Sequence, residues 1–182
     1  MKKLALSIIG AMMVMVSAFA QEPVASQTKD VEISKSQLFA FTKMFVADKW
    51  MNANDALVNA DEEVGVVQVS SKTTISIKQG MGLGCQYKYE YTVRFRLKDN
   101  KYRIEIYDII CTDAAQVGMG SRYDVPLLEY FEGEEPKAKT QSMGKGATKK
   151  QAKQVMDELR AEFQTIIDSY AKYIETNSND DF

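Results

Sequence analysis

Basic side chains recur at alternate positions along three stretches that have the pattern of β-strands. Because alternate residues of a strand lie on the same face of a sheet, these side chains are predicted to share one exposed face. They are Lys72, Lys78, Lys88, Arg94, Arg96, Lys98, Lys101 and Arg103. Guanidinium and ammonium groups bind carboxylates and phosphates. The pattern therefore predicts a surface for an anionic partner, either an acidic protein, a lipid phosphate or an acidic glycan. The candidate binding residues are those of the central hairpin: Lys88, Arg94, Arg96, Lys98, Lys101 and Arg103.

The same face carries few acidic residues. Only Glu90 and Glu105 alternate into it, so eight basic and two acidic residues leave an excess of +6 on a chain whose net charge is −2. Arg94 is predicted opposite Glu105, a favourable cross-strand pair, whereas Arg96 is predicted opposite Arg103, where like charges repel. The alternative interpretation is that these are ordinary solvent-facing residues that discourage aggregation of sheet edges. Nucleic acid is not expected as a partner, because the chain is acidic overall and is expected to be exported.

Catalytic chemistry has fewer candidates. The chain has no histidine, which excludes a histidine base and a zinc site with histidine ligands, and its two cysteines cannot form a four-cysteine site. Ser121 or Cys111 as a nucleophile lacks a visible base. The remaining candidates are carboxylates and one tyrosine: Glu105, Asp108, Asp113 and Tyr107. We predict a non-enzymatic binding or envelope-associated domain without a cofactor, and the alternative is an uncharacterised carboxylate-dependent enzyme.

Two further patterns are weaker. Gly80, Gly82 and Gly84 suggest a phosphate-binding loop, but no helix follows to present its N-terminus, so a hairpin tip is predicted. The acidic residues Glu129, Glu132, Glu134 and Glu135 lack the spacing of a calcium-binding loop, so a solvated loop is predicted within the irregular stretch 112–148.

The strands that position the basic face are clearest in residues 86–111. Apolar and polar residues alternate up to Leu97, Asp99-Asn100 supplies a two-residue turn, and alternation resumes from Tyr102. If Lys98 pairs with Lys101, paired residue numbers sum to 199 and the apolar residues of both strands share one face.

The far end of this hairpin does not fit the same register. Asp108 would fall on the apolar face, so a bulge is predicted there. Cys111 would lie opposite Lys88, three residues from Cys85 and about 10 Å away along the strand. A disulfide needs Cα atoms within about 7 Å, so the register argues against a bridge unless the glycine-rich segment curls back.

The remaining elements complete a two-layer α+β fold. A strand over 67–78, with a break near Ser70-Ser71, is predicted to pair Ile77 with Tyr87 and form an antiparallel meander. Helices are predicted over 35–58, after a Ser34 capping box, and over 148–175. The second helix has an apolar stripe of Ala152, Val155, Met156, Leu159, Phe163, Ile166, Ile167, Tyr170 and Ile174. We expect an antiparallel sheet of 3–5 strands with the N-terminal and C-terminal helices packed on one face.

The N-terminus has the features of a secretory signal peptide. Lys2 and Lys3 precede an apolar run, and Ala18-Phe19-Ala20 matches a cleavage site. The run is too short to span a membrane. The predicted organisation is a signal peptide over 1–20, a connector with a short edge strand near Val31 and Ile33 over 21–33, a single α+β domain over 34–176 and a disordered tail over 177–182. The mature protein is expected in the periplasm or outside the cell.

The order of elements, together with the turn Leu97-Lys98-Asp99-Asn100-Lys101-Tyr102-Arg103, resembles a family of secreted bacterial domains of unknown function with a TBP-like fold. Ile106-Tyr107-Asp108-Ile109 and Pro126-Leu127-Leu128-Glu129 also resemble segments of that family. Asn100 stands where the family usually has glycine. The resemblance covers residues 34–175 and implies a two-layer α+β fold with helices on one sheet face. It implies no activity and no catalytic residues.

Overall fold

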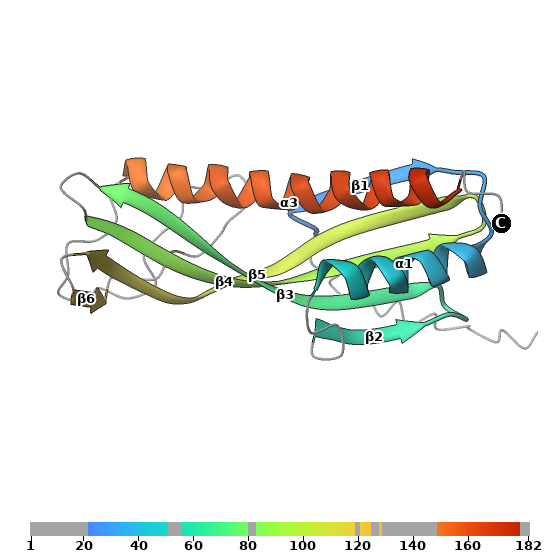
Figure 1. Ribbon diagram of the computed structural model, residues 1–182, viewed down its shortest axis with the longest axis horizontal. Helices are drawn as coiled ribbons and strands as arrows, with labels where there is room; N and C mark the ends of the chain where they lie inside the picture. Colours follow the sequence, from blue (N-terminus) through green and yellow to red (C-terminus); the bar gives the residue numbers. More distant parts are fainter. Residues whose placement is uncertain are drawn as a thin grey trace, which may run out of the picture.

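A computed structural model describes residues 22–50, 56–79, 83–118, 121–124, 128 and 149–178. Its elements in chain order are β1 (Ala25–Asp30), α1 (Lys35–Lys49), β2 (Leu57–Asp61), β3 (Val66–Gln79), β4 (Leu83–Lys98), β5 (Lys101–Gly118), β6 (Ser121–Asp124) and α3 (Lys149–Ser178). The strands form one layer, and α1 and α3 lie on the same face of it (Figure 1). This arrangement confirms the predicted two-layer α+β fold. We call the face under the helices the inner face and the opposite one the outward face.

The sheet is antiparallel throughout, in the order β1-β5-β4-β3-β2. β6 also pairs with β5, on the edge that β1 occupies further along, because β4 follows the other edge of β5. Six described strands therefore fill five positions, where three to five strands were predicted. The edge strand at the N-terminus is Ala25–Asp30, several residues earlier than the predicted Val31 and Ile33.

The turn of the β4–β5 hairpin has the predicted register. Lys98 pairs with Lys101, and the same sum holds as far as Thr92 and Tyr107. Asn100 adopts a φ of 61°, which asparagine tolerates better than most residues. The predicted bulge also exists, since Asp108 has a φ of 55° and the pairing shifts between Glu90 and Thr92.

A second shift follows between Lys88 and Tyr89. The first shift already places Cys111 opposite Tyr89, not opposite Lys88 as the simple register predicted, and the second places Asp113 opposite Lys88. Both Cys85 and Cys111 are buried, and neither is part of a disulfide within the described residues. Cys85 lies opposite Gln116, so the two cysteines are separated along the strands and no disulfide forms between them.

The predicted pairing of β3 was wrong by two residues. Ile75, not Ile77, lies opposite Tyr87, and Ile77 lies opposite Cys85. A slip of two keeps every side chain on its predicted face, so the apolar residues still meet. The strand also runs without a break through Ser70-Ser71, and the hairpin closes with Gln79 opposite Leu83. Residues 80–82 lie outside the described part.

The first helix begins as predicted and ends earlier. Ser34 and Gln37 form the capping box, and the Asp99 carboxylate accepts a 2.8 Å hydrogen bond from the Lys35 backbone N–H. The predicted end near residue 58 was wrong, because the last residue of α1 is Lys49 and β2 begins at Leu57. The spacing of apolar residues continues past residue 50, so the sequence pattern did not show where the helix ends and this strand begins.

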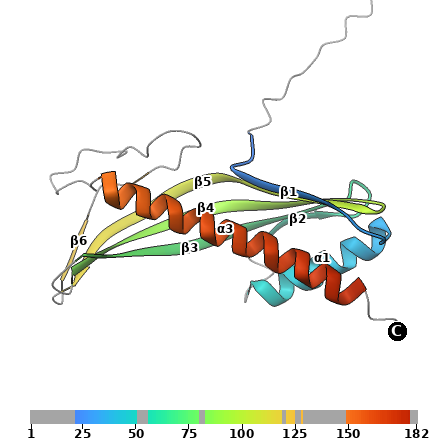
Figure 2. The ribbon, with the colours of Figure 1, turned by 90° about the horizontal axis from the view of Figure 1, so that it is seen from above.

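The C-terminal helix α3 runs along the length of the sheet, and β1 forms one edge of the sheet (Figures 1 and 2). Every residue of the predicted apolar stripe is buried, from Ala152 to Ile174. Tyr170 contacts Phe45, Phe95 and Tyr102 with its ring and hydrogen-bonds Thr42 at 2.7 Å. The helix reaches Ser178, so residues 177 and 178 are helical, contrary to the predicted tail. The predicted signal peptide, residues 179–182 and the Glu129–Glu135 cluster lie outside the described part.

Candidate anion-binding site

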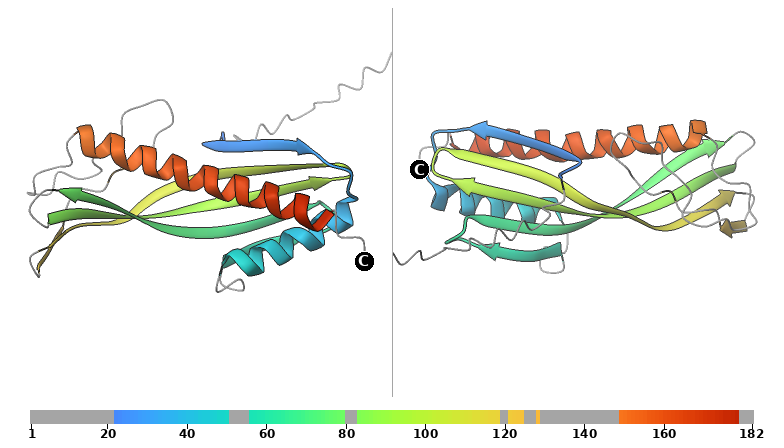
Figure 3. Two further views of the ribbon diagram at one scale, coloured as in Figure 1. Left: turned by 45° about the horizontal axis from the view of Figure 1, so that its top comes forward. Right: turned by 180° about the vertical axis from the view of Figure 1, so that it is seen from behind.

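The outward face positions the predicted basic residues. Among the described elements, no helix covers this face, and Figure 3 shows it from behind with both helices on the far side. Register brings Arg94, Arg96 and Arg103 together on β4 and β5. Lys98 and Lys101 face each other beside the turn, while Lys88 lies on the other side of the Asp108 bulge. The six candidate residues therefore divide into one cluster and three peripheral lysines.

One carboxylate organises the cluster. Glu105 is only 6% exposed, and its oxygens lie 2.9 Å from Arg96 Nε, 3.0 Å from Arg103 Nε and 3.9 Å from Arg94 Nη1. The predicted pair of Arg94 with Glu105 is present, but Arg96 and Arg103 are closer. Arg96 and Arg103 do lie opposite each other. The Glu105 carboxylate lies between the two guanidiniums and offsets their predicted repulsion. The sequence prediction considered only directly opposite pairs and so missed this contact.

The three arginines carry more donors than Glu105 can use. A guanidinium has about five N–H donors and a carboxylate has about four acceptor sites, so roughly fifteen donors meet one carboxylate. Arg96 and Arg103 keep 51% and 45% of their side chains exposed. Surplus donors are therefore available to an external anion.

Tyr107 lies beneath one of these arginines. The Arg94 guanidinium is 4.4 Å from the centre of the Tyr107 ring, within the range of a cation–π contact. Burial raises the pKa of the Tyr107 hydroxyl, and the Arg94 charge partly opposes that rise. This contact and the ion pair with Glu105 hold Arg94 from two sides.

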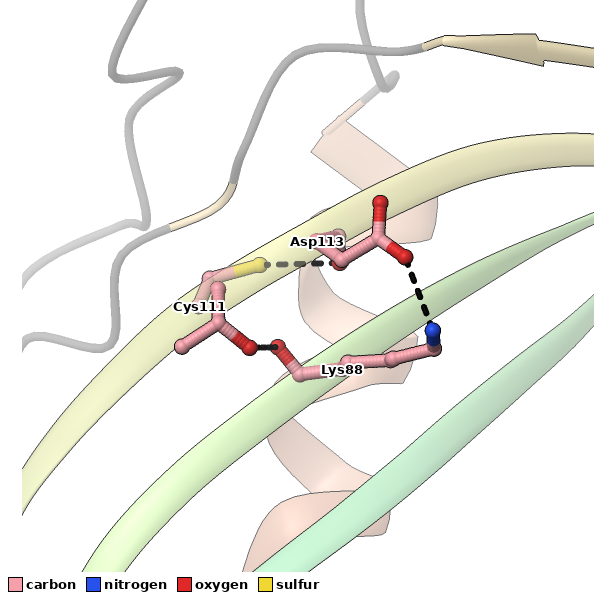
Figure 4. A network of polar contacts seen from close by, with 4 residues as sticks. Lys88, Cys111 and Asp113 are labelled. Carbon is pink, nitrogen blue, oxygen red and sulfur yellow. Dashed lines mark hydrogen bonds and ion pairs between the residues drawn. The ribbon is translucent and has the colours of Figure 1, made fainter.

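Two of the peripheral lysines have acidic partners that the sequence pattern did not include. Lys101 lies 3.0 Å from Asp30 of β1. Lys88 lies 3.0 Å from Asp113, and Figure 4 shows the two side chains facing each other across β4 and β5. The two register shifts in β5 bring Asp113 opposite Lys88. The positive excess of the outward face is therefore smaller than the predicted +6, and the cluster around Glu105 is the most basic feature of the face.

A cleft of about 420 Å³ opens beside the cluster. The turn between β2 and β3 forms one wall, and β4 forms the other. Its lining residues are Val64, Gly65, Val66, Gln68, Arg94, Arg96, Leu97 and Lys98. Sequence reasoning missed this cleft because it placed the turn residues at the end of a helix. Gly65, with a φ of 72°, was the available signal for a tight turn.

The carboxylates among the catalytic candidates each have different surroundings. Glu105 forms ion pairs with arginines, and Asp113 forms one with Lys88. Asp108 is exposed at the bulge and does not line the cleft. Cys111 is buried, which raises the pKa of its thiol, and its Sγ–H is directed to the Asp113 carbonyl oxygen at 3.6 Å. The side chain of Ser121 lies outside the described part.

No group of three or more Cys, Asp and Glu side chains with the geometry of a metal site occurs in the described ranges. Neither helix has the length and apolar character needed to cross a lipid bilayer, as far as the described residues show.

The comparisons with known proteins agree with this architecture. The model of a protein family described as "Domain of unknown function (DUF4468) with TBP-like fold" matches residues 28–111. The match confirms the resemblance predicted from the hairpin motifs, which lie inside this range, whereas the Pro126–Glu129 segment lies beyond it. No curated protein matches the chain.

Two solved structures are similar to the chain. A TBP-like protein from Parabacteroides distasonis aligns with a TM-score of 0.54 at 18% identity, covering 86% of this chain and 93% of that one. A DUF4468 family protein from Bacteroides ovatus aligns with a TM-score of 0.42 at 14% identity, covering 55% of this chain and 58% of that one. The first alignment establishes the TBP-like fold and nothing about a ligand.

Proposed function

We propose that this protein is an exported, non-enzymatic binding domain that captures an anionic partner, in the bacterial envelope or outside the cell, through its outward face. The observation that carries the proposal is the cluster of Arg94, Arg96 and Arg103 around the buried Glu105. Export is inferred from the signal-peptide pattern of residues 1–20.

The cluster differs from ordinary solvent-facing basic residues. An isolated surface arginine samples many rotamers and contributes little to an ion pair. Here Glu105 orders three guanidiniums before any partner arrives, so less side-chain entropy is lost on binding. Glu105 is also poorly placed to act as a general base, since its oxygens already contact arginines. These features favour binding over catalysis by a carboxylate.

The charge-reversal test must spare the fold. Arg96→Glu with Arg103→Glu would place three carboxylates together around a buried position, so unfolding would be hard to separate from loss of binding. Arg96→Gln with Lys98→Gln leaves Glu105 paired with Arg94 and Arg103. The matched control removes two charges from the exposed side of α3, by Lys153→Gln with Lys172→Gln.

The measurement is capture of partners from native envelope extract by crosslinking, with binding to vesicles of phosphatidylglycerol and phosphatidylcholine measured alongside. We expect the variant of the outward face to lose a partner or vesicle binding that the α3 control keeps. Equal behaviour of both variants would contradict the proposal. Export is tested separately by fractionating cells and measuring the mass of the protein in the exported fraction. The expected mass is that of a chain beginning at Gln21.

A further inference from the structure

The cleft beside the arginine cluster has two walls of different chemistry. Gln68 and Val66 on β3 lie opposite Arg94 and Arg96 on β4, and Lys98 extends the basic wall. Val64 and Val66 also line the cleft and supply its apolar part. Val64 is 68% exposed, so its side chain is accessible from solvent.

The turn that carries this apolar surface is firmly held. The Leu97 backbone N–H donates to the Gly65 carbonyl oxygen at 2.7 Å, and the Val64 N–H donates to Asp61 Oδ1 at 2.9 Å. The Lys35 ammonium donates to the Glu63 carbonyl oxygen at 3.0 Å. A Cβ atom at Gly65 would collide with the Leu97 carbonyl oxygen. The backbone of the turn therefore fits against β4 only with glycine at this position. Because these contacts hold the turn in place, this wall of the cleft is formed without a ligand.

The basic wall is ordered by Glu105. Its oxygens lie 2.9 Å from Arg96 Nε and 3.0 Å from Arg103 Nε, so these two guanidiniums donate to a planar carboxylate at hydrogen-bonding distance. Arg94 is further restrained by its contact with the Tyr107 ring. Lys98 is exposed and lies on the open side of the cleft. A second carboxylate entering the cleft would meet ordered guanidinium donors and one exposed ammonium group.

We propose that the cleft binds a carboxylate carried next to a short apolar group, as in the C-terminal residue of a peptide or a free small acid. The carboxylate would contact Arg94, Arg96 and Lys98, the apolar group would lie on Val64 and Val66, and Glu105 would act as the positioning residue. The volume of about 420 Å³ falls within the range of roughly 300–1,000 Å³ typical of small-ligand sites. A phosphate or a highly charged glycan would leave the apolar wall without a contact.

This inference rests on the proposed function, and the experiment separates the two. N-acetyl-leucine, N-acetyl-leucinamide, N-acetylglycine and inorganic phosphate are titrated into the isotopically labelled protein, and backbone amide shifts are followed by NMR. We expect N-acetyl-leucine to bind about ten-fold more tightly than its amide. The amides of Gly65 and Val66 should move most. A peptide ending in leucine that binds more tightly than N-acetyl-leucine would identify a chain end, and equal affinity would identify a free acid.

Two variants of exposed residues test the two walls. Lys98→Gln is expected to weaken N-acetyl-leucine binding about two- to five-fold, while its control Lys78→Gln, on the same face but outside the cleft, leaves binding unchanged. Val64→Ser is expected to reduce the preference for N-acetyl-leucine over N-acetylglycine about three-fold. Its control, Val58→Ser, changes an apolar residue of β2 that is also exposed, at 59%, and lies outside the cleft.

Each contrary outcome has a defined meaning. Equal binding of acid and amide, or phosphate binding that Val64→Ser does not alter, would overturn the inference. If N-acetyl-leucine does not bind but the outward face still captures an envelope partner, the inference fails and the proposed function stands. If neither binding is found, both fail.

Discussion

On the inner side of β4, Val93, Phe95 and Leu97 are at most 1% exposed, whereas Arg94 and Arg96 on the outward side keep 29% and 51% of their side chains exposed. The same strand thus supplies two surfaces with different physics. The inner surface gains stability from burying apolar area under α1 and α3. The outward surface gains its order from electrostatics, with one buried carboxylate among three guanidiniums. The difference shows that an open sheet face can be structured without a covering helix.

The largest loss of stability is expected from a substitution in the aromatic centre of the inner face. Phe95 contacts Phe45 and Tyr170 and is fully buried, so Phe95→Ala should lower the free energy of unfolding by about 3–5 kcal/mol. Lys98→Ala, three residues along on the outward face, should change it by less than about 0.5 kcal/mol. Urea denaturation followed by circular dichroism provides the measurement. Similar losses for both variants would show that the two faces are not energetically distinct.

Alkaline pH should also act through the inner face. Burial raises the pKa of Tyr91 and of Tyr102 from 10 to about 12, and it raises the pKa of Tyr87, Tyr89 and Tyr170 as well. Between pH 10 and 12 the unfolded chain therefore holds fewer protons than the folded one, so stability falls as pH rises. The loss should be on the order of 2 kcal/mol per tyrosine.

The alkaline loss is measured by urea midpoints across this range, with tyrosinate absorbance recorded in parallel. Tyr102→Phe should give a shallower loss, because its hydroxyl has no hydrogen-bond partner among the described residues and the substitution removes one titrating group. A midpoint that stays constant up to pH 12 would contradict the burial of these hydroxyls.

Glu105 tests the outward face directly. Glu105→Gln keeps the shape but leaves three guanidiniums close together without their anion. We expect a loss of about 1–3 kcal/mol, below the roughly 3–5 kcal/mol for a fully buried pair, since the arginines are partly exposed. The control is Glu90→Gln, whose partner Lys72 is 73% exposed and whose loss should not exceed about 0.5 kcal/mol. Equal, small losses for both would mean that Glu105 does not organise the cluster.

The smallest effect is expected at the bulge, which decides the face on which later residues of β5 fall. Asp108 has a φ of 55° and an exposed side chain. Asp108→Val should cost about 1–2 kcal/mol, since a β-branched residue is strained in this region. Asp108→Gly should stay within about 0.5 kcal/mol of the wild type. Thermal unfolding of both variants distinguishes backbone strain from loss of the carboxylate, which the two substitutions share.

Local patterns in the sequence were enough to predict several elements of the fold. The period of two in residues 87–97, the Asp99-Asn100 turn and the stripe of α3 are each specified by neighbours along the chain. For that reason the pairing near the turn and the inner face were predicted correctly. The β3–β4 register could slip by two residues because such a slip leaves the burial pattern unchanged. The end of α1 was missed because the apolar spacing continues into β2.

The sequence by itself determined which residues of the strands face the helices and which face solvent, since alternation is a local property of strand backbone. Only the tertiary structure decided what the solvent-facing residues do. Glu105 is buried because three arginines from two strands surround it, and the cleft exists because the β2–β3 turn is fastened to α1 and β4. Both depend on distances between segments far apart in the chain, which no local pattern encodes.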